Sequence, residues 1–263
     1  MAGVALSLAG KVALVTGGSR GIGAETVRLF IEAGTRVAFS YQIARERAEA
    51  LVAECGGSER CVALCQELSN PEDGRALVHA AVQAFGRLDV LVANHGIWES
   101  RDAPIAEMDD AQWRRTLGVN LDSVFGLVQA AVGQMEKQGR GTEGVAGHIV
   151  LISSTAGQRG EAYHADYAVT KGALISLTKS LSSELAGKGI LVNCVAPGWV
   201  ATEMSAGALQ DGVQGPKIAA SIPVGRVGSA REIAGPVLFL CTPFAGFISG
   251  EVLNVNGGAV LVG

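Results

Sequence analysis

Hydrophobic residues occur along this chain in short runs that alternate with longer amphipathic stretches. The short runs are rich in Val, Ile and Leu, which is typical of strands buried on both faces of a sheet. They lie at Val12–Val15, Val37–Phe39, Cys61–Leu64, Val90–Val92, Ile149–Ile152, Ile190–Val195 and Val252–Val255. The amphipathic stretches predict helices and lie at Ala24–Ala33, Arg45–Glu54, Pro71–Phe85, Asp110–Gln138, Ala165–Ala186 and Ala230–Leu240.

This alternation predicts an α/β fold, with a doubly wound, mostly parallel sheet of seven strands and helices on both faces. No linker, low-complexity tract or internal repeat divides the sequence, so residues 1–263 are expected to form a single domain. The uncharged stretch 233–250 is long enough to suggest a membrane span. Because Pro236 and Pro243 interrupt it, we expect a buried helix followed by a loop, and no membrane association.

Composition narrows the classes of function. A net charge of −4 provides no basic surface for nucleic acid. The five cysteines are odd in number and lack Cys-x-x-Cys spacing, and the four histidines are scattered, so neither a metal site nor a disulfide framework is expected. Reduced thiols, and a start without the basic residues of a signal peptide, predict a cytoplasmic protein.

The first predicted strand leads into a glycine-rich turn, Thr16-Gly-Gly-Ser-Arg-Gly-Ile-Gly23, and a helix follows at once. Glycines let backbone amides approach a pyrophosphate, and the helix N-terminus favours an anion. A plain tight turn would also use glycine, but the flanking strand and helix favour dinucleotide binding.

The end of the second strand indicates which dinucleotide is bound. An acid for the ribose 2′-hydroxyl of NAD is missing there, since the chain reads Ser40-Tyr41-Gln42. Arg20, Arg45 and Arg47 could instead bind a 2′-phosphate. Arg45 and Arg47 could equally decorate a solvated helix face. We therefore expect NADP(H), with NAD(H) as the less favoured cofactor.

Tyr167 and Lys171 are four residues apart in a predicted helix and so lie on one face of it. A nearby ammonium is expected to lower the pKa of the phenol, which would then transfer protons near neutral pH. The alternative is a partly exposed aromatic residue beside a solvated lysine.

Other polar residues stand where strands end or helices are apolar. Asn94-His95-Gly96 follows the fourth strand and Ser153-Ser154 follows the fifth, at the edge where such sheets bind ligands. Asn120 interrupts an apolar helical pattern, which is typical of a functional residue but also fits a satisfied core amide. Residues 203–228 have the Gly- and Pro-rich composition of a mobile lid.

Together these motifs resemble the short-chain dehydrogenase/reductase family, in its short single-domain branch with a Rossmann-type sheet. The resemblance runs from Gly10 to Gly258. It implies a catalytic tetrad of Asn120, Ser154, Tyr167 and Lys171. In that tetrad Tyr167 would be the general acid and base and Ser154 would polarise the carbonyl. Lys171 would lower the tyrosine pKa and hold the nicotinamide ribose, and Asn120 would anchor a water.

The resemblance also implies the residues that hold the cofactor. They are Gly17, Ser19, Arg20, Gly21, Ile22 and Gly23 in the phosphate turn, with Tyr41, Asn94, Gly96, Pro197, Gly198, Val200, Thr202 and the pair Tyr167 and Lys171. Two positions depart from the family pattern. His95 replaces a small residue, and Glu67, followed by Leu68, replaces an Asp that commonly faces the adenine.

The substrate is expected to be a carbonyl compound or secondary alcohol. The nearest subgroup is the 3-oxoacyl-[acyl-carrier-protein] reductases, and of its two basic carrier-docking positions one falls on Lys188 and the other on Val145. Trp98, Trp199 and Met204 predict an apolar pocket wall or simple packing. Relatives that act on other ketones, alcohols or sugars remain an alternative, as does a non-catalytic NADP-sensing protein. The last strand resembles one often buried in a tetramer, so a homo-oligomer is expected.

Overall fold

Seven strands form the centre of the computed structural model, which describes residues 5–141 and 143–262. The strands are β1 (Val12–Val15), β2 (Arg36–Tyr41), β3 (Cys61–Cys65), β4 (Val90–Ala93), β5 (Gly147–Ile152), β6 (Ile190–Pro197) and β7 (Val252–Val255). They are ordered β3-β2-β1-β4-β5-β6-β7, and each neighbouring pair is parallel. The predicted α/β sheet is therefore confirmed.

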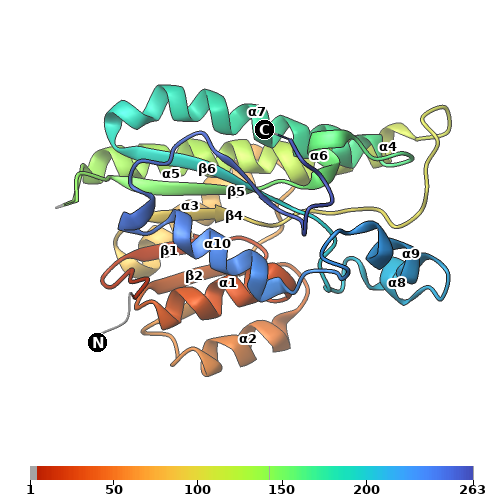
Figure 1. Cartoon of the computed structure of the whole chain (residues 1–263). Helices are drawn as coiled ribbons and strands as arrows, with labels where there is room; N and C mark the ends of the chain where they lie inside the picture. The colour runs from red at the N-terminus through yellow and green to blue at the C-terminus, as the bar shows by residue number, and fades with distance from the viewer. Residues whose placement is uncertain (1–4, 142, 263) are drawn as a thin grey trace.

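Helices cover both faces of this sheet (Figure 1). One layer contains α1 (Gly21–Glu32), α2 (Arg45–Glu54) and α10 (Ala230–Leu240), and the other contains α3 (Pro71–Phe85), α5 (Ser123–Gln138) and α7 (Ala165–Leu185). Along β1 the side chains alternate between the layers: Ala13 and Val15 pack with the first, Leu14 with the second. All these strand residues are buried, which explains their unbroken hydrophobic character.

Three segments differ from the sequence prediction. The helix expected over Asp110–Gln138 is divided into α4 (Asp110–Leu117), a π-helical turn at Gly118–Asp122 and α5. A short helix, α6 (Thr155–Arg159), follows β5. The segment 203–228, expected as a loop-like lid, contains α8 (Ala206–Gln210) and α9 (Gln214–Ser221).

The uncharged stretch 233–250 consists of most of α10, a 3₁₀ turn at Pro243–Ala245 and a loop. This is the buried helix and loop that the sequence predicted. Within residues 5–141 and 143–262, no helix has both the length and the hydrophobicity needed to cross a bilayer.

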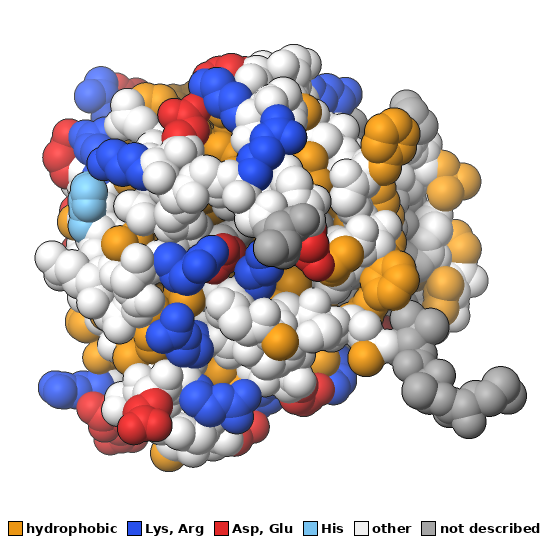
Figure 2. Space-filling model, turned by 90° about the vertical axis from the view of Figure 1, so that its left-hand side faces the viewer, with side chains coloured by type: hydrophobic (Ala, Val, Ile, Leu, Met, Phe, Trp, Pro, Cys, Tyr) orange, Lys and Arg blue, Asp and Glu red, His pale blue; other side chains and the backbone are white. Residues whose placement is uncertain are grey.

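The parallel arrangement places the carboxyl ends of all strands at one edge of the sheet. From β1 the sheet is built in one direction through β2 and β3 and in the other direction from β4 to β7. The connections that leave β1 and β4 therefore diverge to opposite faces, and a crevice forms beyond the ends of these two strands. Figure 2 shows the opposite side of the molecule, where Lys and Arg side chains are scattered between acidic and hydrophobic ones. The carboxyl edge is therefore where a ligand site is expected in this fold.

Close packing of α5 on α3 depends on Gly126, where a Cβ would overlap the Pro71 carbonyl oxygen, whereas Gly133 in the same helix has open space. Gly126→Ala should lower the free energy of unfolding by about 1–3 kcal/mol, because the added methyl group forces the helices apart. Gly133→Ala is the matched control and should raise it by about 0.5–1 kcal/mol through helix propensity. Urea unfolding measures both, and equal effects would contradict this packing.

Candidate active site

The glycine turn joins β1 to α1 in a conformation that only glycine adopts easily. Gly17 and Gly21 have φ angles of 64° and 56°. A Cβ on Gly18 would lie 2.5 Å from the Cβ of Phe39, and one on Gly23 would lie 2.7 Å from Nδ2 of Asn94. The turn therefore packs tightly on β2 and β4, and its backbone leads directly into the N-terminus of α1.

Side chains from neighbouring strands hold the turn in place. The Gly17 amide donates to Oγ of Ser40 at 3.0 Å, and Nδ2 of Asn94 donates to the Thr16 carbonyl at 2.9 Å. The Thr16 hydroxyl oxygen accepts from the amides of Asn94 and His95 at 2.9 and 3.1 Å. Asn94 thus helps to hold the turn in place, and it also lines the pocket at this edge of the sheet.

A cavity of about 510 Å³ extends from the glycine turn to the end of β5. Most predicted cofactor and catalytic residues line it: Gly17, Ser19, Arg20, Gly21, Ile22, Tyr41, Glu67, Leu68, Asn94, Gly96, Ser154, Tyr167, Lys171, Pro197, Gly198, Val200 and Thr202. Gly23 and Asn120 are behind its wall, and the predicted wall residues Trp98, Trp199 and Met204 line it. Such an elongated pocket fits a dinucleotide together with a small substrate.

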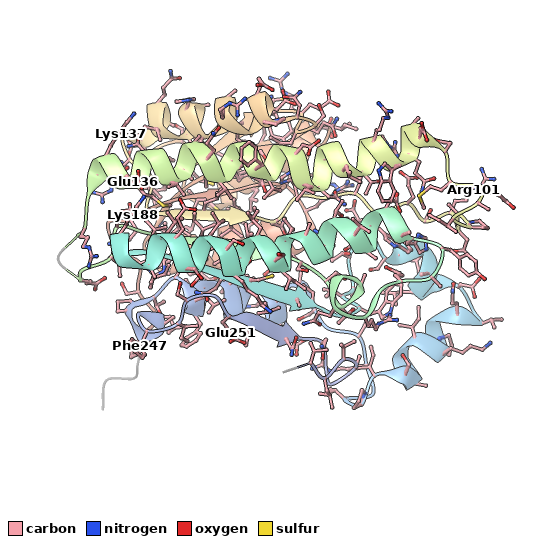
Figure 3. All side chains as sticks on the ribbon, turned by 90° about the horizontal axis from the view of Figure 1, so that it is seen from above. Arg101, Glu136, Lys137, Lys188, Phe247 and Glu251 are labelled. Carbon is pink, nitrogen blue, oxygen red and sulfur yellow. The ribbon has the colours of Figure 1, made fainter. Side chains whose placement is uncertain are left out.

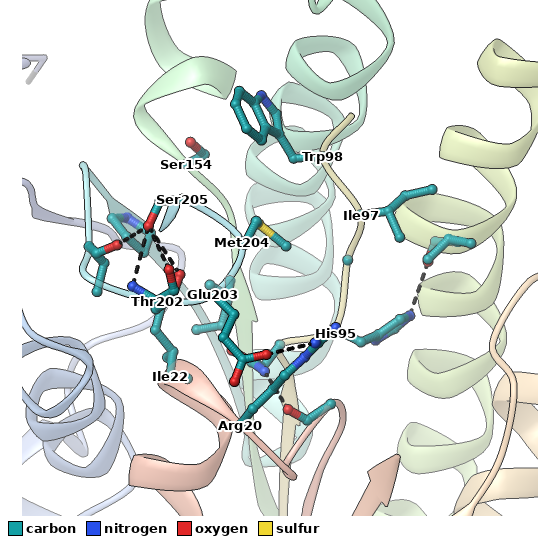
Figure 4. Close-up of a pocket in the computed structure, with 18 of the residues that line it drawn as sticks. Arg20, Ile22, His95, Ile97, Trp98, Ser154, Thr202, Glu203, Met204 and Ser205 are labelled. Atoms are coloured by element: carbon teal, nitrogen blue, oxygen red, sulfur yellow. Dashed lines mark hydrogen bonds and ion pairs between the residues drawn. The ribbon is translucent and has the colours of Figure 1, made fainter. Parts of the chain in front are cut away.

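Ser154 stands at the start of α6, where its Oγ accepts a hydrogen bond from the Ala156 amide at 3.1 Å. This N-cap fixes the hydroxyl at the mouth of the pocket (Figure 4). The neighbouring Ser153 hydroxyl donates to the Lys171 carbonyl at 2.7 Å. The end of β5 is therefore tied to the helix that carries Tyr167.

Tyr167 corrects one expectation from the sequence. The pKa of its phenol is raised to about 12, because burial disfavours the phenolate. A hydrogen bond with Ser154 acts in the opposite direction and is the smaller effect. The predicted lowering of this pKa by Lys171 is wrong for this structure, since the sequence showed the spacing of the two residues but not the depth of their burial.

Lys171 lies on the same side of α7, with Nζ 5.6 Å from the centroid of the Tyr167 ring. Its ammonium donates to the Ile152 carbonyl at 2.9 Å. Burial lowers the pKa of Lys171 to about 8. The alternative of a partly exposed tyrosine beside a solvated lysine is therefore wrong about the lysine, which is buried and directed at the end of β5.

Asn120 lies in the π-helical turn and is fully buried. Its Nδ2 donates to the Ile97 carbonyl at 2.9 Å and to Oγ1 of Thr170 at 3.2 Å, and its Oδ1 accepts from the Ile97 amide at 2.8 Å. The amide thus connects the loop after β4 with α7. A π-turn at a functional position is common, and this one supplies the local irregularity that the sequence suggested.

His95 turns its ring away from the centre of the pocket and into the π-helical turn. Its Nδ1 is 2.7 Å from Oγ1 of Thr16, and its Nε2 is 3.0 Å from the Val119 carbonyl and 2.8 Å from Oγ of Ser123. Burial, aided by the charge of Lys171, lowers the pKa of His95 to about 3. The ring is therefore neutral at physiological pH and connects the glycine turn to the turn that carries Asn120.

The arginines expected to bind a 2′-phosphate fall into two groups. Arg45 is exposed and pairs with Glu49 of its own helix at 2.9 Å, as on a solvated helix face. Arg20 pairs with Glu203 at 2.9 Å, and Arg47 also pairs with Glu203. Figure 4 shows the Glu203 carboxylate directed at Arg20.

Sequence reasoning missed several residues of this pocket. Arg159, Glu161 and Glu203 all line it. In the sequence, only their positions could have indicated a place in the pocket: Arg159 and Glu161 lie between Ser154 and Tyr167, and Glu203 directly follows Thr202. Gly157 was also missed: a Cβ there would lie 2.5 Å from the Lys171 carbonyl carbon, so it permits the close approach of α6 and α7.

Comparison with known proteins agrees with this geometry. A family model described as enoyl-(acyl carrier protein) reductase matches residues 17–260. The chain is 38% identical over 258 residues to the 3-oxoacyl-[acyl-carrier-protein] reductase of Vibrio cholerae, covering 98% of this chain and 100% of the relative.

Solved structures give the same result. A proposed NAD(P)-dependent gluconate 5-dehydrogenase of Beutenbergia cavernae with bound NADP is 35% identical, with a TM-score of 0.87 over 97% of this chain and 98% of that one. A 3-ketoacyl-(acyl-carrier-protein) reductase of Brucella melitensis complexed with NADH is 30% identical, with a TM-score of 0.87 over 97% and 100%. The chain therefore belongs to the short-chain dehydrogenase/reductase family of oxidoreductases.

Proposed function

We propose that this protein is an NADP(H)-dependent reductase whose substrate is a 3-oxoacyl thioester. The observation that carries the proposal is the convergence of Ser154, Tyr167 and Lys171 at one end of a pocket whose other end is the glycine turn. The name of the Vibrio cholerae relative supports the substrate class. The Beutenbergia cavernae structure, with bound NADP, supports the cofactor.

The chain's own residues fit a dinucleotide along this pocket. The glycine turn and the N-terminus of α1 would hold the pyrophosphate, and Tyr41, Glu67 and Leu68 would lie about the adenine end. Gly96 and Val200 would flank the nicotinamide end, and Thr202, whose side chain lies beside the glycine turn, would be close to the phosphates. NADPH supplies the hydride when it is bound there.

Ser154, Tyr167 and Lys171 would handle the oxygen and the proton of the reaction. The Ser154 hydroxyl, fixed by its N-cap, would donate a hydrogen bond to the carbonyl oxygen as negative charge develops on it. Tyr167 holds its proton through neutral pH because its pKa is about 12, and it would give that proton to the oxygen. The nearby Lys171 ammonium would attract the negative charge left on the phenol oxygen, strongly so in a buried site.

Docking of an acyl carrier protein would use the outer ends of α5 and α7. Of the two expected docking positions, only Lys188 is basic, and it pairs with Glu136 at 2.6 Å. Figure 3 shows where these two residues lie on the ribbon. An acidic carrier would have to compete with Glu136, and Val145 adds no charge. An assay for this activity should therefore include a thioester of a smaller carrier, such as coenzyme A, beside one of an acyl carrier protein.

A second substrate class is favoured by Arg159 and Glu161 in the pocket wall. A small hydroxylated or acidic ketone would use such groups, whereas an acyl chain would not. The two classes are separated by following NADPH absorbance with acetoacetyl thioesters and with hydroxylated ketones, and in reverse with sugar acids. Turnover of hydroxylated ketones alone would replace the thioester proposal.

Tyr167→Phe should reduce kcat by at least about 100-fold, because it removes the proton donor. Nucleotide binding, measured by NADPH fluorescence, should be retained. The control is Tyr163→Phe, since Tyr163 is exposed and four residues earlier in the chain. Wild-type turnover by Tyr167→Phe would rule out the assignment of this residue.

Reduction should lose activity as the pH rises through about 8, the pKa of Lys171. Below that value the ammonium is charged and supports the phenolate formed on Tyr167, and above it the charge is lost. The Tyr167 phenol itself stays protonated until about pH 12, so it does not cause this fall. We expect kcat/KM to decline about tenfold per pH unit above 8. A plateau that continues to pH 10 would show that Lys171 does not act in this way.

A further inference from the structure

Glu203 makes ion pairs with two arginines that come from different elements. Arg20 is the N-cap residue of α1 in the phosphate turn, and Arg47 lies on α2. Glu203 Oε2 is 2.9 Å from Nη1 of Arg20, and its Oε1 contacts Nη1 of Arg47. The two guanidiniums lower the pKa of the Glu203 carboxyl, so it is fully ionised at neutral pH.

The backbone fixes Glu203 at this position. The Ser205 hydroxyl donates to the Val200 carbonyl at 2.5 Å and accepts from the Thr202 amide at 3.3 Å, which folds the segment into a compact loop. The Thr202 side chain lies against the glycine turn, with its Cγ2 3.4 Å from where a Cβ of Gly21 would be. These contacts hold the backbone of Glu203 beside the turn, and the two arginines hold its carboxylate there.

The same two guanidiniums could also bind an anion, because Arg20 lines the pocket and Arg47 reaches the same carboxylate. Arg45, which lies near Tyr41, is engaged with Glu49 of its own helix. Arg20 and Arg47 instead converge on one point beside the glycine turn, and that point is held by the Glu203 carboxylate. A phosphate monoester carries between one and two negative charges at neutral pH and would seek the same hydrogen-bond donors.

We propose that Glu203 is a specificity-determining residue, which competes with the 2′-phosphate of NADP(H) for Arg20 and Arg47 and so limits the preference of the enzyme for NADP(H) over NAD(H). The inference rests on the proposed cofactor site. Binding of the 2′-phosphate requires the carboxylate to release both arginines or to share them at the cost of repulsion between like charges. NAD(H) has a hydroxyl at that position and leaves the ion pairs intact.

The test compares the dissociation constants of NADPH and NADH, measured by nicotinamide fluorescence on the full chain. Glu203→Gln removes the charge but keeps the size of the side chain. Because the ion pairs are exposed and individually weak, NADPH should bind about 3- to 10-fold more tightly to this variant. NADH binding should change less than about twofold. Binding of 2′,5′-ADP and AMP gives the same comparison without the nicotinamide end.

Glu46→Gln is the matched control, since it removes one negative charge from α2, and in the described part of the chain Glu46 pairs with none of Arg20, Arg45 and Arg47. It should leave the NADPH-to-NADH ratio as in the wild type. Arg47→Gln should weaken NADPH binding selectively. If Arg47→Gln weakens NADPH binding while Glu203→Gln leaves the NADPH-to-NADH ratio unchanged, competition by Glu203 is refuted, but the proposed cofactor site is not. If Arg20→Gln and Arg47→Gln both leave NADPH binding unchanged, the 2′-phosphate site is refuted as well.

Discussion

The contact between α6 and α7 is the constraint on which the active site depends. Gly157 lets the two helices meet backbone to backbone, because any side chain there would lie within 2.5 Å of the Lys171 carbonyl carbon. That approach brings the N-cap residue of α6, Ser154, beside Tyr167 on α7. The Ser153 hydroxyl, bonded to the Lys171 carbonyl, fixes the same contact to the end of β5. The hydroxyls of Ser154 and Tyr167 are therefore positioned by backbone packing and need no contact with a ligand to meet.

Burial then sets the protonation of the groups that this packing brings together. Burial raises the pKa of the Tyr167 phenol, which therefore stays neutral, and it lowers the pKa of the Lys171 ammonium. The buried Asp166, next to the tyrosine, accepts hydrogen bonds from Thr116 at 2.7 Å and Gln112 at 3.2 Å. These bonds tie α7 to α4. The site thus combines a phenol that is neutral at physiological pH with an ammonium whose pKa, about 8, is close to that pH.

Much of this arrangement could be predicted from the sequence, because it depends on local patterns. The seven hydrophobic runs specified the strands, and parallel pairing brought Asn94, Ser154 and the glycine turn to one edge. Asn120 was recognised because it breaks a helical pattern, and the π-helical turn is the structural form of that break. The spacing of Tyr167 and Lys171 placed them on one side of α7.

The rest required knowledge of what lies beside each residue in space. The spacing of Tyr167 and Lys171 could not show that burial raises the pKa of the phenol and lowers the pKa of the ammonium. His95 was expected near the cofactor, but its ring fits between Thr16 and Val119 because two turns from distant parts of the chain meet there. The pairing of Glu203 with Arg20 spans 183 positions, and no local pattern predicts it.

A crystal structure of the protein with NADPH bound tests the central claim most directly. The account predicts that the nicotinamide ring lies beside the Tyr167 hydroxyl, with Lys171 at its ribose and the pyrophosphate over the glycine turn. It also predicts that Ser154 and Tyr167 keep their present positions, since backbone packing fixes them. A nicotinamide ring bound away from these side chains, or a bound state in which α6 and α7 separate, would contradict the account.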